Sequence, residues 1–189
     1  MRRIILKVAG GPLETSVVRM AIPMVYALWE GYVKEVCQLY LEHIEDNVSR
    51  AADLHPAILG HMWTPDLRRL TGGLNFSRKK LVATLALAAG ASPVAFRDRE
   101  KEVDTKSNLD FDTLRNIADH LCLDISALAG WRNPLNALVH LRNNIAHGAR
   151  PSRLTYPDFN EYAHMALSLM EGFEDVLSSA VTNRAFCTV

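Results

Sequence analysis

The sequence lacks the features of secreted, disulfide-bonded and membrane proteins. Its three cysteines, Cys37, Cys122 and Cys187, are far apart and form no Cys-x-x-Cys pair, which argues against a disulfide framework or a zinc knuckle. No apolar run reaches the length that spans a membrane. Two glycines and a proline at residues 10–12 interrupt the apolar start, so a signal peptide is not expected. We therefore expect a cytoplasmic protein without a membrane partner.

Excess charge of either sign is also missing. Lys and Arg together number 21, as do Asp and Glu, so the formal net charge is zero. The overall charge gives no sign of nucleic-acid binding, and any basic surface must be local. No glycine-rich phosphate loop occurs, and His55 and His61 alone are too few ligands for a metal site. We expect neither a cofactor nor a metal.

What the sequence does contain is helical periodicity in a chain long enough for a sizeable core. The 189 residues are 49% hydrophobic, which fits a single compact domain over residues 1–189. Apolar residues recur at three- and four-residue steps, with no convincing strand and no internal repeat. The pattern predicts an all-α fold, an up-and-down bundle of four to five main helices with its core at about 16–181. The expected helices cover about 16–48, 56–70 with a break at Thr64-Pro65, 78–89, 111–121, 134–147 and 158–181.

Two segments are expected to lack regular structure. Residues 1–12 are predicted to form a loose or short extended start. Residues 97–108 are densely charged with both signs, which favours a solvated loop or linker that interrupts the domain without dividing it.

The most informative stretch is residues 138–148, an apolar run that gains an arginine, two asparagines and a histidine before a glycine. Its apolar residues have the spacing of a helix face turned to a core, and Gly148 is suited to end that helix. Arg142 and His147 then lie on its last turns. The arginine fork matches phosphate oxygens and a histidine exchanges a proton near neutral pH, a combination suited to phosphodiester cleavage.

These residues carry a resemblance to a known family. Residues 142–147, Arg-Asn-Asn-Ile-Ala-His, fit the Arg-polar-x-x-x-His motif of the HEPN superfamily. With the following glycine, they resemble the branch of MAE-like and RiboL-PSP-like HEPN nucleases. Residues 24–34 are similar to the opening helix of that branch, with its aromatic-Glu-Gly core. The resemblance covers roughly residues 22–181.

The resemblance implies a small all-α domain that dimerises near its motif helix. It also implies a metal-independent endoribonuclease, of a kind often found as a toxin or phage-defence effector beside an antitoxin or defence-system protein. Arg142 and His147 match the catalytic pair, Asn143 matches the polar residue after the arginine, and Glu30 matches the acidic residue of the first helix.

Ordinary structural roles remain open for several of these residues. Without the resemblance, Arg142 is an ion-pair partner and His147 a favourable residue at a helix C-terminus. Asn143 and Asn144 are also suited to bond backbone near the helix end, and Glu30 precedes Lys34 by four residues, as an ordinary ion pair does. Arg150 and Arg153 follow the motif and are weak candidates for RNA contact, because a solvated loop explains them better.

Helix geometry complicates the catalytic hypothesis. Five residues at about 100° each place Arg142 and His147 about 140° apart around an ideal helix and ~7.5 Å apart along it. Either the helix distorts before Gly148, or a two-fold dimer brings two copies of the motif to one cleft, where one histidine acts as base and the other as acid. The alternative function is a non-catalytic HEPN module that binds a partner protein or a nucleotide.

Overall fold

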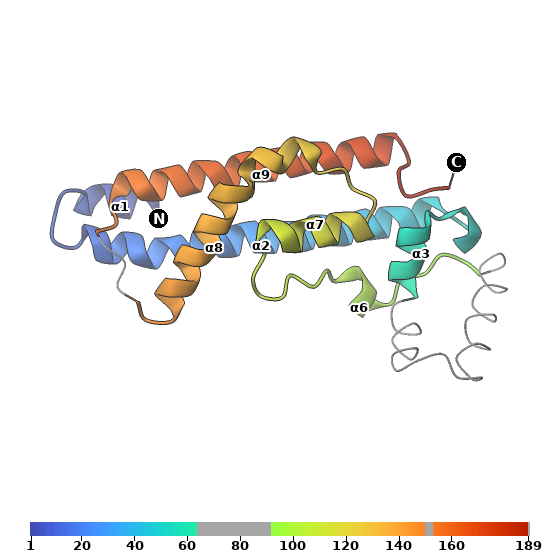
Figure 1. Cartoon of the computed structure of the whole chain (residues 1–189), viewed down its shortest axis with the longest axis horizontal. Helices are drawn as coiled ribbons and strands as arrows, with labels where there is room; N and C mark the ends of the chain where they lie inside the picture. Colours follow the sequence, from blue (N-terminus) through green and yellow to red (C-terminus); the bar gives the residue numbers. More distant parts are fainter. Residues whose placement is uncertain (64–91, 150–152, 189) are drawn as a thin grey trace. The chain divides into compact units, whose positions relative to one another are not determined.

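The computed structural model describes residues 1–63, 92–149 and 153–188. Its regular structure is helical, and within these ranges the only β-type pairing consists of two isolated bridges, Arg50 with Pro93 and Leu54 with Cys187. The predicted all-α class is confirmed. In these ranges the α-helices are α1 (Arg2–Val8), α2 (Glu14–Asn47), α3 (Pro56–Met62), α6 (Asp98–Lys101), α7 (Phe111–His120), α8 (Arg132–Ala146) and α9 (Tyr156–Thr182) (Figure 1).

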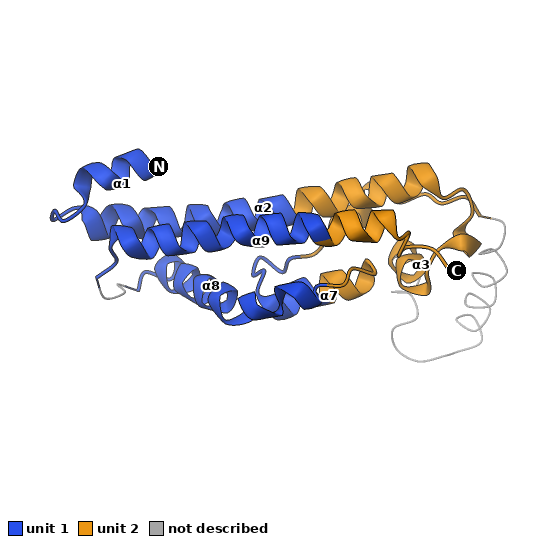
Figure 2. Cartoon of the chain, turned by 90° about the horizontal axis from the view of Figure 1, so that it is seen from above, with its two compact units in different colours: residues 1–33, 105–115, 125–175 blue, residues 34–104, 116–124, 176–189 orange. Residues whose placement is uncertain are grey.

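The chain forms two compact units (Figure 2). Unit 1 contains residues 1–33, 105–115 and 125–175, and unit 2 contains residues 34–104, 116–124 and 176–189. The motif predicted from sequence lies entirely in unit 1. In the part of the chain that the structure describes, no helix is both long enough and apolar enough to cross a membrane.

Unit 1 is built on a parallel pair of helices, α2 and α9. The first residue of α9, Tyr156, donates its backbone N–H to Glu14 at the start of α2, 2.8 Å away. Further along both helices, the ring of Trp29 meets that of Phe173 edge-on, with 6.3 Å between centroids. Both rings are fully buried. Because their starts meet and their later turns meet, α2 and α9 run in the same direction.

The start of the chain is helical, so the prediction of a loose segment over residues 1–12 is wrong. Residues 2–8 form α1, whose Ile5 is fully buried. The turn after α1 is fixed by Glu14, a buried carboxylate that accepts a hydrogen bond from the Gly10 N–H at 3.0 Å. A buried apolar side chain and a satisfied carboxylate together order a segment whose sequence pattern is too short to predict a helix.

The longer helices agree with their predicted ranges to within a few residues. α2 includes Pro23 inside its length, and α3 begins with Pro56 at its first position. α8 begins at Arg132, two residues before the predicted start, because the 3-10 turn Ser126–Trp131 (η3) leads straight into it and no side chain caps it. The helix predicted over 78–89 lies outside the described residues.

The prediction of a solvated loop over residues 97–108 is partly wrong. Residues 98–101 form α6, and the side chains of Glu100, Val103 and Thr105 are buried. The Glu100 carboxylate accepts a hydrogen bond from the backbone N–H of Arg97 at 2.9 Å. The charged residues on which the loop prediction is based therefore make local capping contacts. These contacts allow the apolar side chain of Val103 to reach a core.

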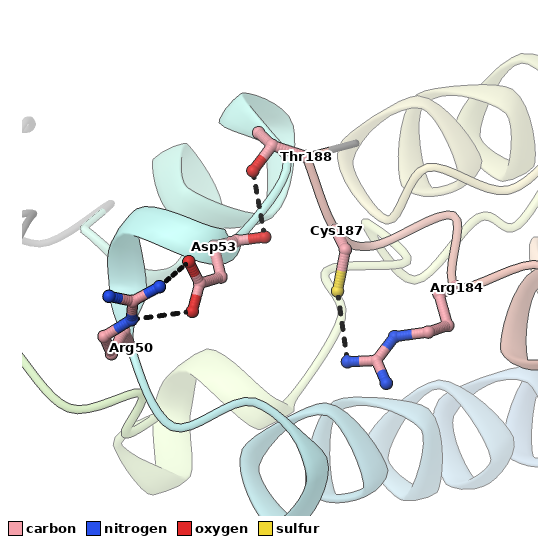
Figure 3. A network of polar contacts seen from close by, with 5 residues as sticks. All are labelled: Arg50, Asp53, Arg184, Cys187 and Thr188. Carbon is pink, nitrogen blue, oxygen red and sulfur yellow. Dashed lines mark hydrogen bonds and ion pairs between the residues drawn. The ribbon is translucent and has the colours of Figure 1, made fainter.

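Unit 2 fastens the end of the chain to the turn after α2. The backbone N–H of His55 donates to the Phe186 carbonyl at 2.7 Å, and that of Thr188 donates to the Asp53 carbonyl at 2.9 Å. The carboxylate of Asp53 accepts two bonds from Arg50, at 2.9 and 2.8 Å (Figure 3). The Phe186 ring is buried edge-on against Tyr40.

Candidate functional site

The motif helix α8 ends where the sequence predicts, through a left-handed glycine. Gly148 has φ +81°, a conformation that favours glycine. Its N–H donates to the Ile145 carbonyl at 3.1 Å, and the N–H of Ala149 donates to the Asn144 carbonyl at 2.9 Å. These are the two bonds of a Schellman motif, which makes His147 the last half-helical residue and leaves its side chain exposed at the helix end.

Arg142 projects from α8 onto α2 and the segment before α7. Its guanidinium lies over the aromatic ring of Tyr26. One terminal nitrogen, Nη2, donates to the carbonyl of Ser107 at 2.8 Å. Its Nε is buried and has no hydrogen-bond partner among the described residues, and none of their carboxylates forms an ion pair with it. A half-buried cation with a neutral partner and an unused donor is incompletely satisfied.

Tyr26 links Arg142 to Glu30 electrostatically. Burial raises the pKa of the Tyr26 phenol, and the Glu30 carboxylate raises it further. A hydrogen bond from the Leu109 backbone N–H lowers the same pKa, as do a hydrogen bond with the Arg142 side chain and the charge of Arg142. Both charged groups therefore act on one phenol. Glu30 also accepts a hydrogen bond from the hydroxyl of Thr105, a buried residue. The acidic residue predicted from sequence is thus grouped with the predicted arginine.

The two asparagines contact different partners. The amide nitrogen of Asn143 donates to Oδ1 of Asn108 at 2.9 Å, so Asn143 holds the segment before α7. The amide nitrogen of Asn144 lies 3.2 Å from Nδ1 of His140, one turn back on α8. No described hydrogen bond joins the side chain of either asparagine to the imidazole of His147.

Within a single chain, no described hydrogen bond joins the side chains of Arg142 and His147, and the imidazole of His147 makes none within the described ranges. The backbone N–H of His147 donates to the Asn143 carbonyl at 2.9 Å, which is the regular α-helical bond. The helix therefore does not distort between Arg142 and His147. This excludes helix distortion as the way in which the two side chains come together. Arg153 is exposed, and Arg150 lies outside the described residues.

Several residues of the site were not predicted. Tyr26 precedes Glu30 by four residues and so lies on the same face of α2, a spacing that identifies it once Glu30 is a candidate. Ser107 contributes a backbone carbonyl, and Asn108 contributes a contact between distant segments, so no sequence pattern points to either. Among the described residues, no group of three or more His, Cys, Asp or Glu side chains is placed to hold a metal ion.

Comparison with known proteins adds one match. The family model described as RiboL-PSP-HEPN matches residues 5–179 of the chain. That range includes α2, α8 and nearly all of α9, together with every residue of the site described above. No curated protein and no solved structure matches the sequence.

Proposed function

The chain belongs to the RiboL-PSP-HEPN family, and from that premise we propose that it is a metal-independent endoribonuclease. The observation that carries the proposal is the state of Arg142. Its charge has no described carboxylate partner, and its buried Nε has no described acceptor. A phosphate supplies the negative charge that no described carboxylate provides, and its oxygens are suited to accept hydrogen bonds from a guanidinium.

The proposed reaction uses the ribose 2′-hydroxyl as nucleophile. The imidazole of His147 removes the 2′-hydroxyl proton, and the 2′-oxygen attacks the neighbouring phosphorus. The bond from phosphorus to the 5′-oxygen breaks, and a second imidazole gives that oxygen a proton. Arg142 stabilises the negative charge that grows on the phosphate oxygens. The products are a 2′,3′-cyclic phosphate and a 5′-hydroxyl, and DNA is not cut because it lacks the nucleophile.

The second imidazole is proposed to come from a second copy of the chain. α8 remains regular up to its end, so Arg142 and His147 of one copy face different directions. In a two-fold dimer with the ends of both α8 helices adjacent, the arginine of one copy and the histidine of the other face the same cleft. Such a dimer supplies two exposed histidines, one as base and one as acid.

The test is cleavage of labelled RNA by the purified protein in EDTA. We expect cyclic-phosphate products from the wild type, and a loss of about 10²-fold or more for His147→Ala or Arg142→Ala. His164→Ala is the matched control, because His164 is an exposed histidine on α9 of the same unit. An RNA with a 2′-deoxy residue at the cut site is expected to resist. Cleavage that requires added metal, or that survives His147→Ala, contradicts the proposal.

A second candidate function is a non-catalytic HEPN module that binds a partner protein or a nucleotide. The observation in its favour is that Nη2 of Arg142 already has an acceptor, the Ser107 carbonyl. The zero net charge points the same way. A confirmed dimer that cuts no RNA but binds a nucleoside phosphate through Arg142 is the result that favours this function.

For the cellular role, we propose a cytoplasmic toxin or phage-defence effector held by a cognate antitoxin or defence-system protein. The chemistry supports this because an RNase without a cofactor requirement needs a partner to restrain it. Induced expression in a bacterial host is expected to stop growth for the wild type and not for His147→Ala. Equal growth of both strains at equal expression contradicts a toxin role while leaving the nuclease proposal intact.

A further inference from the structure

The segment before α7 contains a strained tight turn beside Arg142. Lys106 and Ser107 have φ values of +53° and +51°, and the Asn108 N–H donates to the Thr105 carbonyl at 2.9 Å. Two successive positive φ values closed by such a bond are the pattern of a type I′ turn, which favours Asn-Gly at its centre. A lysine and a serine are strained in this conformation, and such strain persists only where the surroundings impose it.

The surroundings that impose this turn are side chains of α2 and α8. Four contacts from the two helices hold residues 105–109, here called the Arg142 turn. They are Thr105 Oγ1 to the Glu30 carboxylate, Arg142 Nη2 to the Ser107 carbonyl at 2.8 Å, Asn143 Nδ2 to Asn108 Oδ1 at 2.9 Å, and the Leu109 N–H to the Tyr26 hydroxyl at 2.7 Å. Together the contacts fix both ends of the turn and two residues between them. Thr105 and Leu109 at the two ends are buried.

We propose that the Arg142 turn is a positioning element for the guanidinium, with Thr105 and Asn108 as its positioning residues. The Ser107 carbonyl holds Nη2 of Arg142, and the Tyr26 ring holds the plane of the guanidinium. Asn108 keeps the Ser107 carbonyl in place, because its side chain joins the end of the turn to Asn143. The guanidinium is thereby oriented before substrate arrives. The inference rests on the proposed function, because it assigns a purpose to aiming Arg142.

A positioned guanidinium explains why the strain is tolerated. A long arginine side chain has many rotamers, and fixing one of them in advance reduces what substrate binding must supply. The contact from Asn143, one residue along α8 from Arg142, adds a rigid link between the turn and the helix that carries the guanidinium.

The first test reads the position of Arg142 without any activity. In the wild type we expect the Arg142 Nε–H to give a sharp, slowly exchanging NMR signal, because that nitrogen is buried. Asn108→Ala is expected to broaden or abolish the signal, and His147→Ala to leave it unchanged. A signal in Asn108→Ala that matches the wild type overturns the proposal, whether or not the protein cleaves RNA.

The second test uses a pair of variants at Thr105, in case Asn108→Ala does not fold. Thr105→Ser keeps the hydroxyl that Glu30 accepts, and Thr105→Val removes it at nearly constant volume. We expect Thr105→Val to lower kcat for RNA by between about tenfold and about a hundredfold with KM changed by less than about threefold, and to lose the sharp Arg142 signal, while Thr105→Ser retains both. Equal behaviour of the two variants overturns the proposal. Absence of cleavage by the wild type defeats the proposed function alone, since the NMR comparison still decides the role of the turn.

Discussion

The guanidinium of Arg142 lies over the ring of Tyr26, with 3.9 Å between Cζ and the ring centroid. Arg142 is the residue best suited to bind a phosphate, and this contact joins it to α2, more than a hundred positions earlier in the chain. It also leaves the positive charge without a described carboxylate to neutralise it. The contact predicts that the aromatic face and the hydroxyl of Tyr26 have separable roles.

Tyr26→Leu removes the aromatic face, whereas Tyr26→Phe removes only the hydroxyl. A partly desolvated cation–π contact contributes about 1–2 kcal/mol, so we expect Tyr26→Leu to lower kcat/KM for RNA roughly tenfold more than Tyr26→Phe. Tyr26→Phe leaves the buried Leu109 N–H unpaired, and we expect it to lower the free energy of unfolding by about 1–3 kcal/mol. Cleavage assays and urea titrations measure the two effects. Equal cleavage by both variants contradicts a role for the ring.

The strain in the Arg142 turn predicts that some substitutions stabilise the protein. Lys106→Asn combined with Ser107→Gly supplies the residues that two successive positive φ values favour. We therefore expect the free energy of unfolding of the double variant to be about 1–2 kcal/mol higher than that of the wild type. Glycine keeps the backbone carbonyl at position 107, and the bond from Arg142 therefore remains available. Urea unfolding measures the gain, and Ser178→Gly, on the exposed face of α9, is a contrast that should lose stability. A loss of stability in the double variant means that the turn is not strained.

Sequence patterns predict those parts of the molecule that depend on local chemistry. The end of α8 is predictable because Gly148 adopts a conformation that other residues avoid, and the cap of α7 because Asp110 accepts from the Thr113 N–H at 2.8 Å. α1 escapes prediction because its order depends on Glu14, a residue beyond it. The same distinction holds for the site. Arg142 and His147 can be predicted from their side-chain chemistry, whereas the Ser107 carbonyl is a backbone group placed by tertiary contacts, which no sequence pattern indicates.

Glu14 is expected to be among the most sensitive polar residues for stability. Its buried carboxylate accepts from the backbone N–H groups of Gly10 and Tyr156, at 3.0 and 2.8 Å. Glu14→Ala leaves both donors without this acceptor, and we expect a loss of roughly 2–4 kcal/mol in the free energy of unfolding. Glu35→Ala, at an exposed position of α2, is the matched control and should change stability by less than about 0.5 kcal/mol. Similar losses in both variants contradict the role given to Glu14.

His61 predicts how stability depends on pH. Burial lowers its pKa below the usual 6.5, outweighing the raising effect of the 2.6 Å contact between Nε2 and the Glu100 carbonyl; nearby His120 lowers the pKa further. Folding therefore favours the neutral ring, and between the lowered pKa and 6.5 the unfolded chain binds more protons. The contribution of His61 to stability is complete above about pH 7 and falls as the pH drops through 6.5.

His61→Gln tests this dependence because glutamine keeps an N–H donor and does not titrate. We expect the free energy of unfolding of the variant to decline less than that of the wild type between pH 7 and pH 5, as followed by urea titration at each pH. His164→Gln, at an exposed histidine, should follow the wild-type curve. A variant with the same or a steeper decline shows that His61 is not the group responsible.

The composite cleft is tested by mixing two inactive variants. In a dimer of Arg142→Ala with His147→Ala, one copy retains the histidine and the other retains the arginine. If a cleft takes these two groups from different copies, the mixed dimer contains one such pair, and we expect RNA cleavage well above that of either variant alone, though below the wild type because only one histidine is present. If each copy worked with its own pair, no mixed dimer would hold a complete set. Co-expression with two affinity tags isolates the mixed dimer, and its cleavage rate in EDTA is compared with those of the parent variants. The regular backbone of α8 up to His147 favours recovery, since it directs the two groups of one copy to different sides of the helix.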